Sequence, residues 1–150
     1  MAGRSPKPGL VTPSDLGQTL MLVSRDFHHR LTLDLKSRGV EGVSARHNAV
    51  FLYLGRNGPS RAVDLALAAG IRPQSMMKIV HELEDMGLVR RQPDPDDSRA
   101  KLIDFTARGR RFIAELRQST ETVWQQYAEM LGETALQDTM SRLNRLVTTA

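Results

Sequence analysis

The middle of the chain contains the stretch that decides the fold. It reads Arg72-Pro73-Gln74-Ser75-Met76-Met77-Lys78-Ile79-Val80-His81-Glu82-Leu83, then Gly87-Leu88-Val89-Arg90-Arg91-Gln92, and then Pro93-Asp94-Pro95-Asp96-Asp97-Ser98-Arg99. Proline suits the first turn of a helix, where its missing N–H costs no hydrogen bond. Glycine is common directly after the last turn. The stretch therefore predicts a helix over about 73–86, followed at once by a basic β-hairpin.

The predicted helix has two different faces. At about 100° per residue, one side gathers the apolar residues Met76, Ile79, Val80, Leu83 and Met86. The opposite side gathers Gln74, Met77, Lys78, His81 and Asp85. Glutamine can bond adenine through two hydrogen bonds, and lysine can reach guanine or a phosphate. An ordinary solvated helix face has a similar composition, so the helix alone leaves DNA binding undecided.

The neighbouring hairpin favours DNA. Residues 88–92 and 101–105 are expected to be short strands, and the loop between them, with Pro93 and Pro95, is expected not to pair as strand. Arg99 and Lys101 are candidates for phosphate or minor-groove contacts. We expect Asp97 to position this wing rather than to touch DNA. Helix and hairpin together predict a winged helix-turn-helix.

Helices flank this unit on both sides. Apolar residues at helical spacing predict helices over about 13–38 and, in two segments, over 107–149. Between them, Ser44 and Ser60 are expected to cap two shorter helices, and Thr106 the fifth. The expected organisation is a flexible tail at 1–12 and one domain at 13–150, with the DNA-binding winged helix at about 44–106. The fold class is mostly α with a small β-hairpin wing.

The flanking helices carry apolar stripes that must be buried somewhere. They could pack within one chain, or the chain ends could pair with a second copy. We favour a homodimer, because a single winged helix contacts little DNA, whereas a two-fold dimer reads two half-sites.

Composition narrows the function classes. The 150 residues carry a net charge of +4, which favours a polyanionic partner without proving one. The absence of cysteine excludes disulfides, thiolate zinc sites and thiol redox sensing, and fits a cytoplasmic protein. No apolar run reaches membrane-spanning length. No phosphate-binding glycine loop, nucleophile elbow or HExxH motif is present, so an enzyme is not expected.

Several segments in joint spacing resemble the MarR family of bacterial transcriptional regulators. They are Asp64-Leu65-Ala66, Leu83-Glu84-Asp85-Met86-Gly87-Leu88-Val89-Arg90-Arg91, Asp94-Pro95-Asp96-Asp97-Ser98-Arg99-Ala100-Lys101 and Phe105-Thr106-Ala107-Arg108-Gly109. The resemblance implies a homodimeric regulator, expected to be a repressor, with the 13–38 and 107–149 helices as dimerisation domain. It also implies recognition helices in successive major grooves of a pseudo-palindrome, wings in the flanking minor grooves, and a DNA contact by Arg99.

Six residues are the predicted DNA contacts. Gln74, Ser75 and Lys78 are expected to touch bases or nearby phosphates, and Arg72, Arg99 and Lys101 the backbone or minor groove. Arg72 stands at the helix N-cap, where serine or asparagine would be about 1 kcal/mol more stabilising. One hypothesis is that Arg72 is kept there for a phosphate.

The resemblance further implies a small aromatic or phenolic effector, with no other cofactor. Arg25, His28, His29 and Tyr53 could line its pocket or be solvated surface, and we favour the surface. A metal site is not expected, because His28 and His29 are adjacent and point in directions about 100° apart. The alternative function is a winged-helix module that binds protein instead of DNA, which the basic hairpin and the Gln74/Lys78 face disfavour.

Overall fold

The computed structural model describes residues 11–148, so most of the predicted tail at 1–12 lies outside the described residues. Along the chain the elements are η1 (Pro13–Asp15), α1 (Leu16–Ser37), η2 (Ala45–His47), α2 (Asn48–Asn57), β1 (Ser60–Arg61), α3 (Ala62–Ala69), α4 (Pro73–Asp85), β2 (Val89–Asp94), β3 (Asp97–Phe105), α5 (Ala107–Leu131) and α6 (Glu133–Thr148). The predicted fold class, mostly α with a small β wing, is confirmed.

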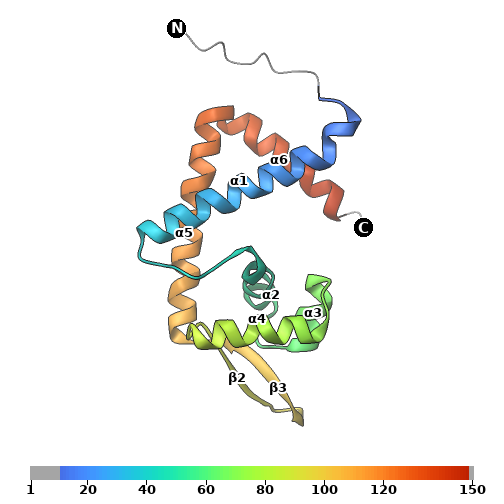
Figure 1. The fold of residues 1–150 in the computed structure, drawn as a ribbon, viewed down its shortest axis with the longest axis vertical. Coiled ribbons are helices and arrows are strands. Elements are labelled where there is room, and N and C mark those ends of the chain that lie inside the picture. The colour runs from blue at the N-terminus through green and yellow to red at the C-terminus, as the bar shows by residue number, and fades with distance from the viewer. Residues whose placement is uncertain (1–10, 149–150) are drawn as a thin grey trace.

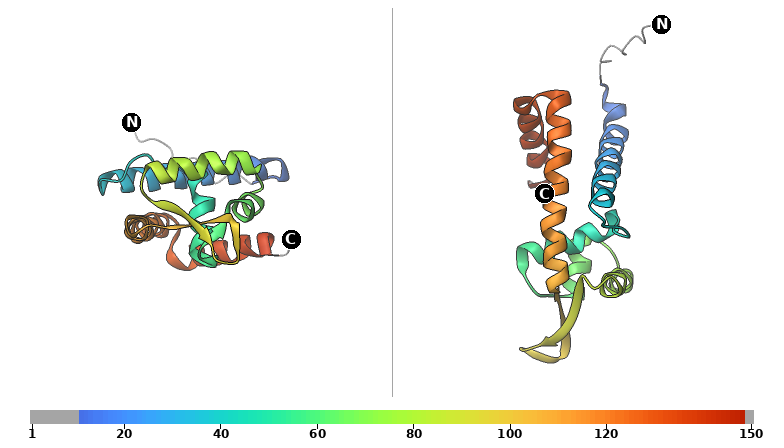
Figure 2. Two further views of the ribbon diagram at one scale, coloured as in Figure 1. Left: turned by 90° about the horizontal axis from the view of Figure 1, so that it is seen from below. Right: turned by 90° about the vertical axis from the view of Figure 1, so that its left-hand side faces the viewer.

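The elements gather at two ends of the molecule (Figure 1). One end holds α2, α3, α4 and the sheet, and β2 and β3 project beyond α4 as the wing. The other end holds α6 and the start of α1. Helix α5 runs from the base of the wing to the far end, and Figure 2 shows α1 lying beside it. Because α5 contacts β3 at the wing end and α6 at the far end, it joins the two ends.

The sheet has three antiparallel strands in the order β1-β3-β2. The expectation that Ser60 caps the third helix is wrong: Ser60 and Arg61 are extended and pair with Ile103 and Leu102, and α3 begins at Ala62. A two-residue strand has no sequence periodicity, and its partner lies some forty residues further along the chain.

The wing strands are longer than predicted. Pro93 and Asp94 belong to β2, opposite Lys101 and Asp97, and the turn consists only of residues 95–96. The expectation that this loop does not pair was therefore wrong. Proline is tolerated because β2 is an edge strand, where a missing N–H need not interrupt the sheet.

The core of the winged helix is aromatic and aliphatic. The ring of Phe51 from α2 lies 6.4 Å from that of Phe105 and 5.1 Å from that of Phe112, so α2, β3 and α5 meet there. The predicted apolar face of α4 is confirmed: four of its residues are buried and Met86 is half-buried. Burial of this face orients the polar face of α4 toward solvent.

A tight junction connects the wing to α5. Thr106 caps α5 as predicted, with its Oγ1 accepting the N–H of Gly109 at 2.9 Å. The same hydroxyl donates to the carbonyl of Gly87. Gly109 packs so closely on Leu88 that a Cβ at position 109 would lie 1.9 Å from the Leu88 carbonyl oxygen. The α4–β2 turn and the first turn of α5 are thus locked together.

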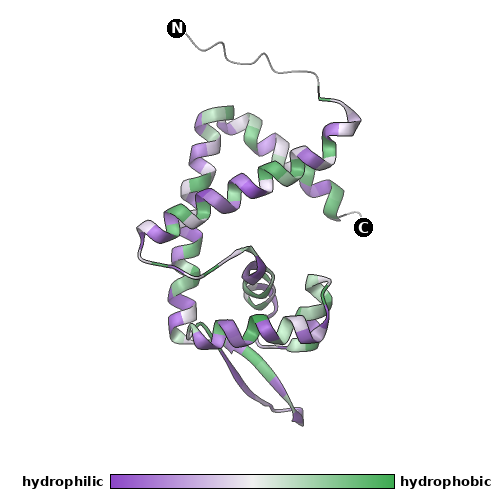
Figure 3. Ribbon diagram, viewed as in Figure 1, coloured by the Kyte–Doolittle hydropathy of each residue, from purple (hydrophilic) through white to green (hydrophobic). Residues whose placement is uncertain are grey.

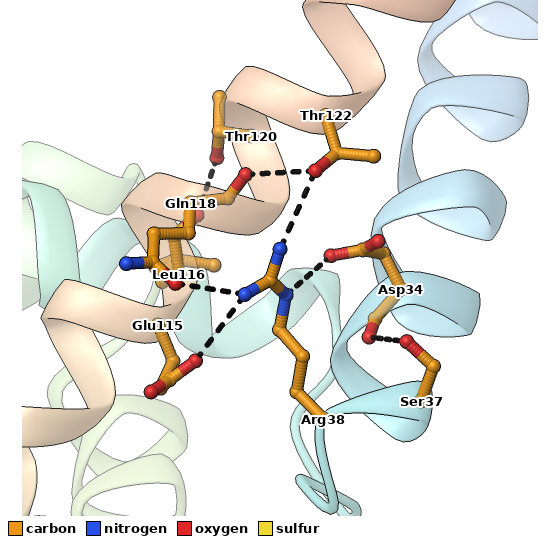
Figure 4. A network of polar contacts seen from close by, with 8 residues as sticks. All are labelled: Asp34, Ser37, Arg38, Glu115, Leu116, Gln118, Thr120 and Thr122. Carbon is orange, nitrogen blue, oxygen red and sulfur yellow. Dashed lines mark hydrogen bonds and ion pairs between the residues drawn. The ribbon is translucent and has the colours of Figure 1, made fainter.

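Polar networks tie α1 to α5. Arg38, at the end of α1, donates to Asp34 at 2.7 Å and to Gln118 of α5 at 2.8 Å (Figure 4). Further toward the start of α1, the Tyr127 hydroxyl donates to Asp26 at 2.8 Å. Burial, together with the Asp26 carboxylate, raises the pKa of Tyr127 to about 12, so the phenol keeps its proton.

Large apolar side chains remain exposed at the end of the molecule that is remote from the wing. They alternate with polar residues along α1, α6 and the end of α5 (Figure 3), and the most exposed are Leu16, Met21, Val23, Met130, Leu131, Leu146 and Val147. Only Leu136 of α6 is buried. Within residues 11–148, no helix is long and apolar enough to span a membrane.

Candidate nucleic-acid interface

Helix α4 presents a polar edge at its N-terminal half. Gln74, Ser75 and Lys78 are all exposed, on the side opposite the buried Met76 and Val80. Arg72 is the N-cap residue, extended and exposed, and its side chain caps no backbone N–H. Four of the six predicted contact residues therefore lie together at the start of α4.

An ion-pair cluster fixes the other half of α4. The Glu82 carboxylate lies 2.9 Å from Nε2 of His47 and 2.9 Å from Nε of Arg46, both on η2. His47 is buried, and its Nδ1 accepts the N–H of Ser44 at 3.0 Å, so Nε2 carries the proton that it donates to Glu82. The hydrogen bonds from His47 and then Arg46 lower the pKa of Glu82. Glu82 thus attaches the recognition helix to the start of α2.

The wing carries the two remaining predicted contacts. Arg99 and Lys101 are exposed on β3. The Oδ1 atom of Asp97 accepts the backbone N–H of Arg99 at 3.0 Å, so Asp97 contacts the main chain of the wing and not the Arg99 guanidinium. Asp97 is therefore placed to shape the turn, as its predicted role requires.

A second aspartate, missed by the sequence reasoning, holds the wing more firmly. Asp94 is buried, and its Oδ2 lies 2.8 Å from Nε and 2.6 Å from Nη2 of Arg61. Its Oδ1 accepts the N–H of Asp96 at 2.9 Å. The N–H of Asp96 and the Arg61 guanidinium lower the pKa of Asp94. The available signal was an acidic residue among the loop prolines, but its partner on β1 is remote in sequence.

The basic residues of the interface differ in whether an acidic side chain pairs with them. Arg91 lies 2.8 Å from Glu84 and Arg110 3.2 Å from Asp104, so part of their charge is neutralised. Among residues 11–148, Arg99 and Lys101 have no acidic side chain within ion-pair distance, and neither does Arg90. Unpaired cations thus lie along the wing, and Arg72 and Lys78 at the start of α4 likewise have no acidic partner among residues 11–148.

A cavity of about 660 Å³ lies between α1, α2 and α5. Its walls include Phe27, Phe51, Arg56, Arg117, Glu121 and Trp124. None of the predicted pocket residues lines it. Arg25 and His29 are exposed on α1, and Tyr53 is half-buried on α2. The predicted pocket residues were chosen by residue type, and residue type does not indicate which side of α1 faces α5.

His28 has a different role from the one considered in the sequence. Its Nδ1 donates to the carbonyl of Ser24 at 2.7 Å, and its Nε2 accepts from the amide of Asn48 at 3.0 Å. It thus links α1 to the start of α2. In the part of the chain that the structure describes, no three His, Asp or Glu residues are grouped as metal ligands.

Comparisons with known proteins agree with this architecture. Residues 41–100 match the sequence model of the MarR family. An uncharacterized HTH-type transcriptional regulator of Mycobacterium leprae is 29% identical over 93 residues, which are 61% of this chain and 65% of that protein. The HTH-type transcriptional repressor IacR of Pseudomonas putida is 29% identical over 98 residues, 65% of this chain and 56% of IacR. The chain thus matches less than two thirds of the length of either relative.

Solved structures extend the likeness beyond the matched segment. The X-ray structure of a MarR-family transcriptional regulator from Rhodococcus sp. RHA1 has a TM-score of 0.74 at 23% identity, over 95% of this chain and 99% of that one. The resemblance noted in the sequence is thereby confirmed. The winged-helix segment at 41–100 thus matches the MarR family of transcriptional regulators, and the chain as a whole has the fold of a solved MarR-family structure.

Proposed function

We propose that the protein is a sequence-specific DNA-binding transcriptional regulator. The observation that carries this proposal is that α4 and the wing lie at the same end of the molecule (Figure 1). Helix α4 carries the exposed Gln74–Lys78 edge, and β3 of the wing carries the unpaired cations Arg99 and Lys101. A helix of this width fits the major groove, and a β-ribbon with cations reaches phosphates or the adjacent minor groove.

The proposed active form is a homodimer. The exposed apolar residues of α1 and α6, such as Leu16 and Leu146, offer a second copy a surface that water solvates poorly. A two-fold dimer presents two α4 helices, which suits a pseudo-palindromic operator whose half-sites are about 34 Å apart. Covering such an operator would repress transcription, as the name of the related IacR indicates for that protein. A function on chromosomal DNA corresponds to a cytoplasmic location.

Selection from a random-sequence duplex library tests the DNA-binding function. The expected result is enrichment of one pseudo-palindrome, with salt-sensitive binding that an unrelated duplex in excess does not abolish. Binding without any sequence preference would overturn the proposal and favour the alternative, a winged-helix module whose partner is a protein.

We further propose that the cavity between α1, α2 and α5 binds a small aromatic or phenolic anion as effector. Phe51 and Trp124 offer ring surfaces, and Arg56 and Arg117 have no acidic partner among residues 11–148. Glu121 on the same wall would disfavour a second negative charge. A ligand here would contact both the dimerisation helices and the DNA-reading part, and would weaken DNA binding by changing the angle between them.

The only tryptophan of the chain lines this cavity and serves as the reporter. Titration with salicylate should quench the Trp124 fluorescence and release bound DNA over the same concentration range. Arg117→Ala should shift both curves to higher salicylate, whereas Arg25→Ala, on the exposed part of α1, should shift neither. Quenching that Arg117→Ala leaves unchanged would contradict the site.

A further inference from the structure

The wing is fastened across the sheet by one ion pair. Arg61 lies on β1 and Asp94 on β2, at opposite edges of a sheet whose central strand is β3. Arg61 is aligned with Leu102, which is aligned in turn with Gln92, so the Arg61 side chain must cross β3 to reach Asp94 two residues further along β2. The pair therefore joins both edge strands at the tip of the wing.

The Arg61–Asp94 pair is buried on its acidic side and has a defined geometry. The side chain of Asp94 is only 6% exposed, and two nitrogens of Arg61 lie on the same oxygen, Oδ2. The ladder is irregular between Pro93 and Asp94, so Asp94 lies where the regular strand pairing is interrupted. A carboxylate buried to this degree requires its cation, because loss of the partner leaves a desolvated charge.

We propose that Arg61 and Asp94 are positioning residues for DNA binding: they hold the wing against the helix-turn-helix so that Arg99 and Lys101 reach the duplex. This inference rests on the proposed function. Arg61 immediately precedes α3, and α3 packs on α4, so the pair relates the wing tip to the recognition helix. Asp97 assists at a longer distance, 3.9 Å from Arg61.

The direction in which one substitution changes the DNA affinity distinguishes a positioning role from a purely electrostatic effect. Asp94→Asn removes a negative charge from a surface that faces polyanionic DNA, so electrostatics alone predicts tighter binding. Loss of positioning predicts the opposite. We expect the dimer to bind its selected duplex more weakly, by roughly fivefold or more. The matched control is Asp96→Asn, the exposed neighbour in the same turn, whose affinity should stay unchanged or rise.

A double-mutant cycle locates the effect in the wing. In an Arg61→Gln background, Arg99→Ala should cost much less affinity than it does in the unaltered protein, because the wing is already displaced. Lys78→Ala on α4 should cost the same in both backgrounds. Additive costs for Arg61→Gln and Arg99→Ala, or tighter binding by Asp94→Asn, would overturn the proposal. This cycle needs no Asp94 variant and remains informative if Asp94→Asn folds poorly.

Hydrogen exchange separates this inference from the DNA-binding function itself. In free protein, Arg61→Gln should speed exchange of the Asp96 and Arg99 amides, which donate to Asp94 and Asp97, and leave α4 amides unchanged. Unchanged exchange at the wing would refute the positioning role whatever the protein binds. Faster exchange in a protein that selects no DNA sequence would instead refute the proposed function.

Discussion

Gly109 shows how a single position without a side chain determines the junction between wing and α5. Its backbone lies against Leu88. Its N–H donates to the Thr106 hydroxyl oxygen, and this hydroxyl donates in turn to the Gly87 carbonyl. Its backbone conformation is ordinary for a helix, so the requirement is steric rather than conformational. The contact partner is backbone and cannot rotate away.

We therefore expect Gly109→Ala to destabilise the fold by about 1–3 kcal/mol or more, the usual range for overpacking. Thermal unfolding measures this. Gly55→Ala is the matched control: Gly55 is inside α2 with nothing within 4 Å of the added Cβ, so alanine should stabilise by about 0.5–1 kcal/mol. Equal melting temperatures for both variants would contradict the close packing at Leu88.

Substitutions of Lys78 and Arg99 test separately the two surfaces proposed to contact DNA, the edge of α4 and the wing. Lys78→Ala and Arg99→Ala should each weaken operator binding by about 1–3 kcal/mol per lost contact, while the dimer mass in sedimentation stays the same. Both side chains are exposed and without acidic partners among residues 11–148, so the fold does not depend on them. Near-unaltered affinity in both variants would remove the proposed surface.

At the scale of elements, α4 is held by charge as well as by its apolar face. Glu82 joins α4 to η2 through Arg46 and His47, and these bonds lower the pKa of Glu82 below its ordinary value of 4.5. A depressed carboxyl pKa in the folded state adds stability that is fully present above 4.5 and is lost as the pH falls through the folded pKa.

Glu82→Gln should therefore be less stable than the unaltered protein at neutral pH, and the difference should shrink as the pH falls below about 4.5. Denaturant unfolding across this range measures it. Asp85→Asn, at an exposed acid in the last turn of α4, is the control and should leave the stability at neutral pH unchanged. A gap between Glu82→Gln and the unaltered protein that is constant with pH would contradict the role of the ionised carboxylate.

The elements differ in how far the sequence predicts them. Both boundaries of α4 and the end of α3 follow from local signals such as Pro73 and Gly70, because capping and periodicity act within a few residues. The pairing of Ser60 with Ile103, the Asp94–Arg61 ion pair and the walls of the cavity depend on contacts between remote segments. Local patterns contain no information on those contacts. The exposed edge of α4 was predictable, since one face of a helix implies the other.

At the scale of the whole molecule, most of the exposed large apolar side chains among residues 11–148 lie on α1, α6 and the end of α5, whereas Leu52, Val63 and Leu67 are exposed on α2 and α3. Leu20 on α1 is 43% exposed, and Met140, Leu146 and Val147 of α6 are 45%, 68% and 72% exposed. This distribution separates a surface suited to a second copy from a surface suited to a polyanion. The two surfaces can therefore be altered independently.

Leu20→Asp should convert the proposed dimer to a monomer, because it places a charge in the apolar stripe of α1. Sedimentation should give the mass of one chain, and operator affinity should fall together with the loss of the second half-site. Leu67→Asp is the control for mass, because Leu67 is 82% exposed on α3, outside the dimerisation helices. A Leu20→Asp protein that stays dimeric would place the interface elsewhere.

The uninterrupted course of α5 has a mechanical consequence. Its 25 residues form a stiff rod about 37 Å long. The close contact of Gly109 with Leu88 fixes the first turn of α5 to the base of the wing, so the base of the wing moves together with α5. By simple trigonometry, a tilt of about 3° at the opposite end displaces the wing base by about 2 Å. In the proposed dimer, small adjustments among the remote helices would thereby be magnified into changes in the spacing between the two α4 helices.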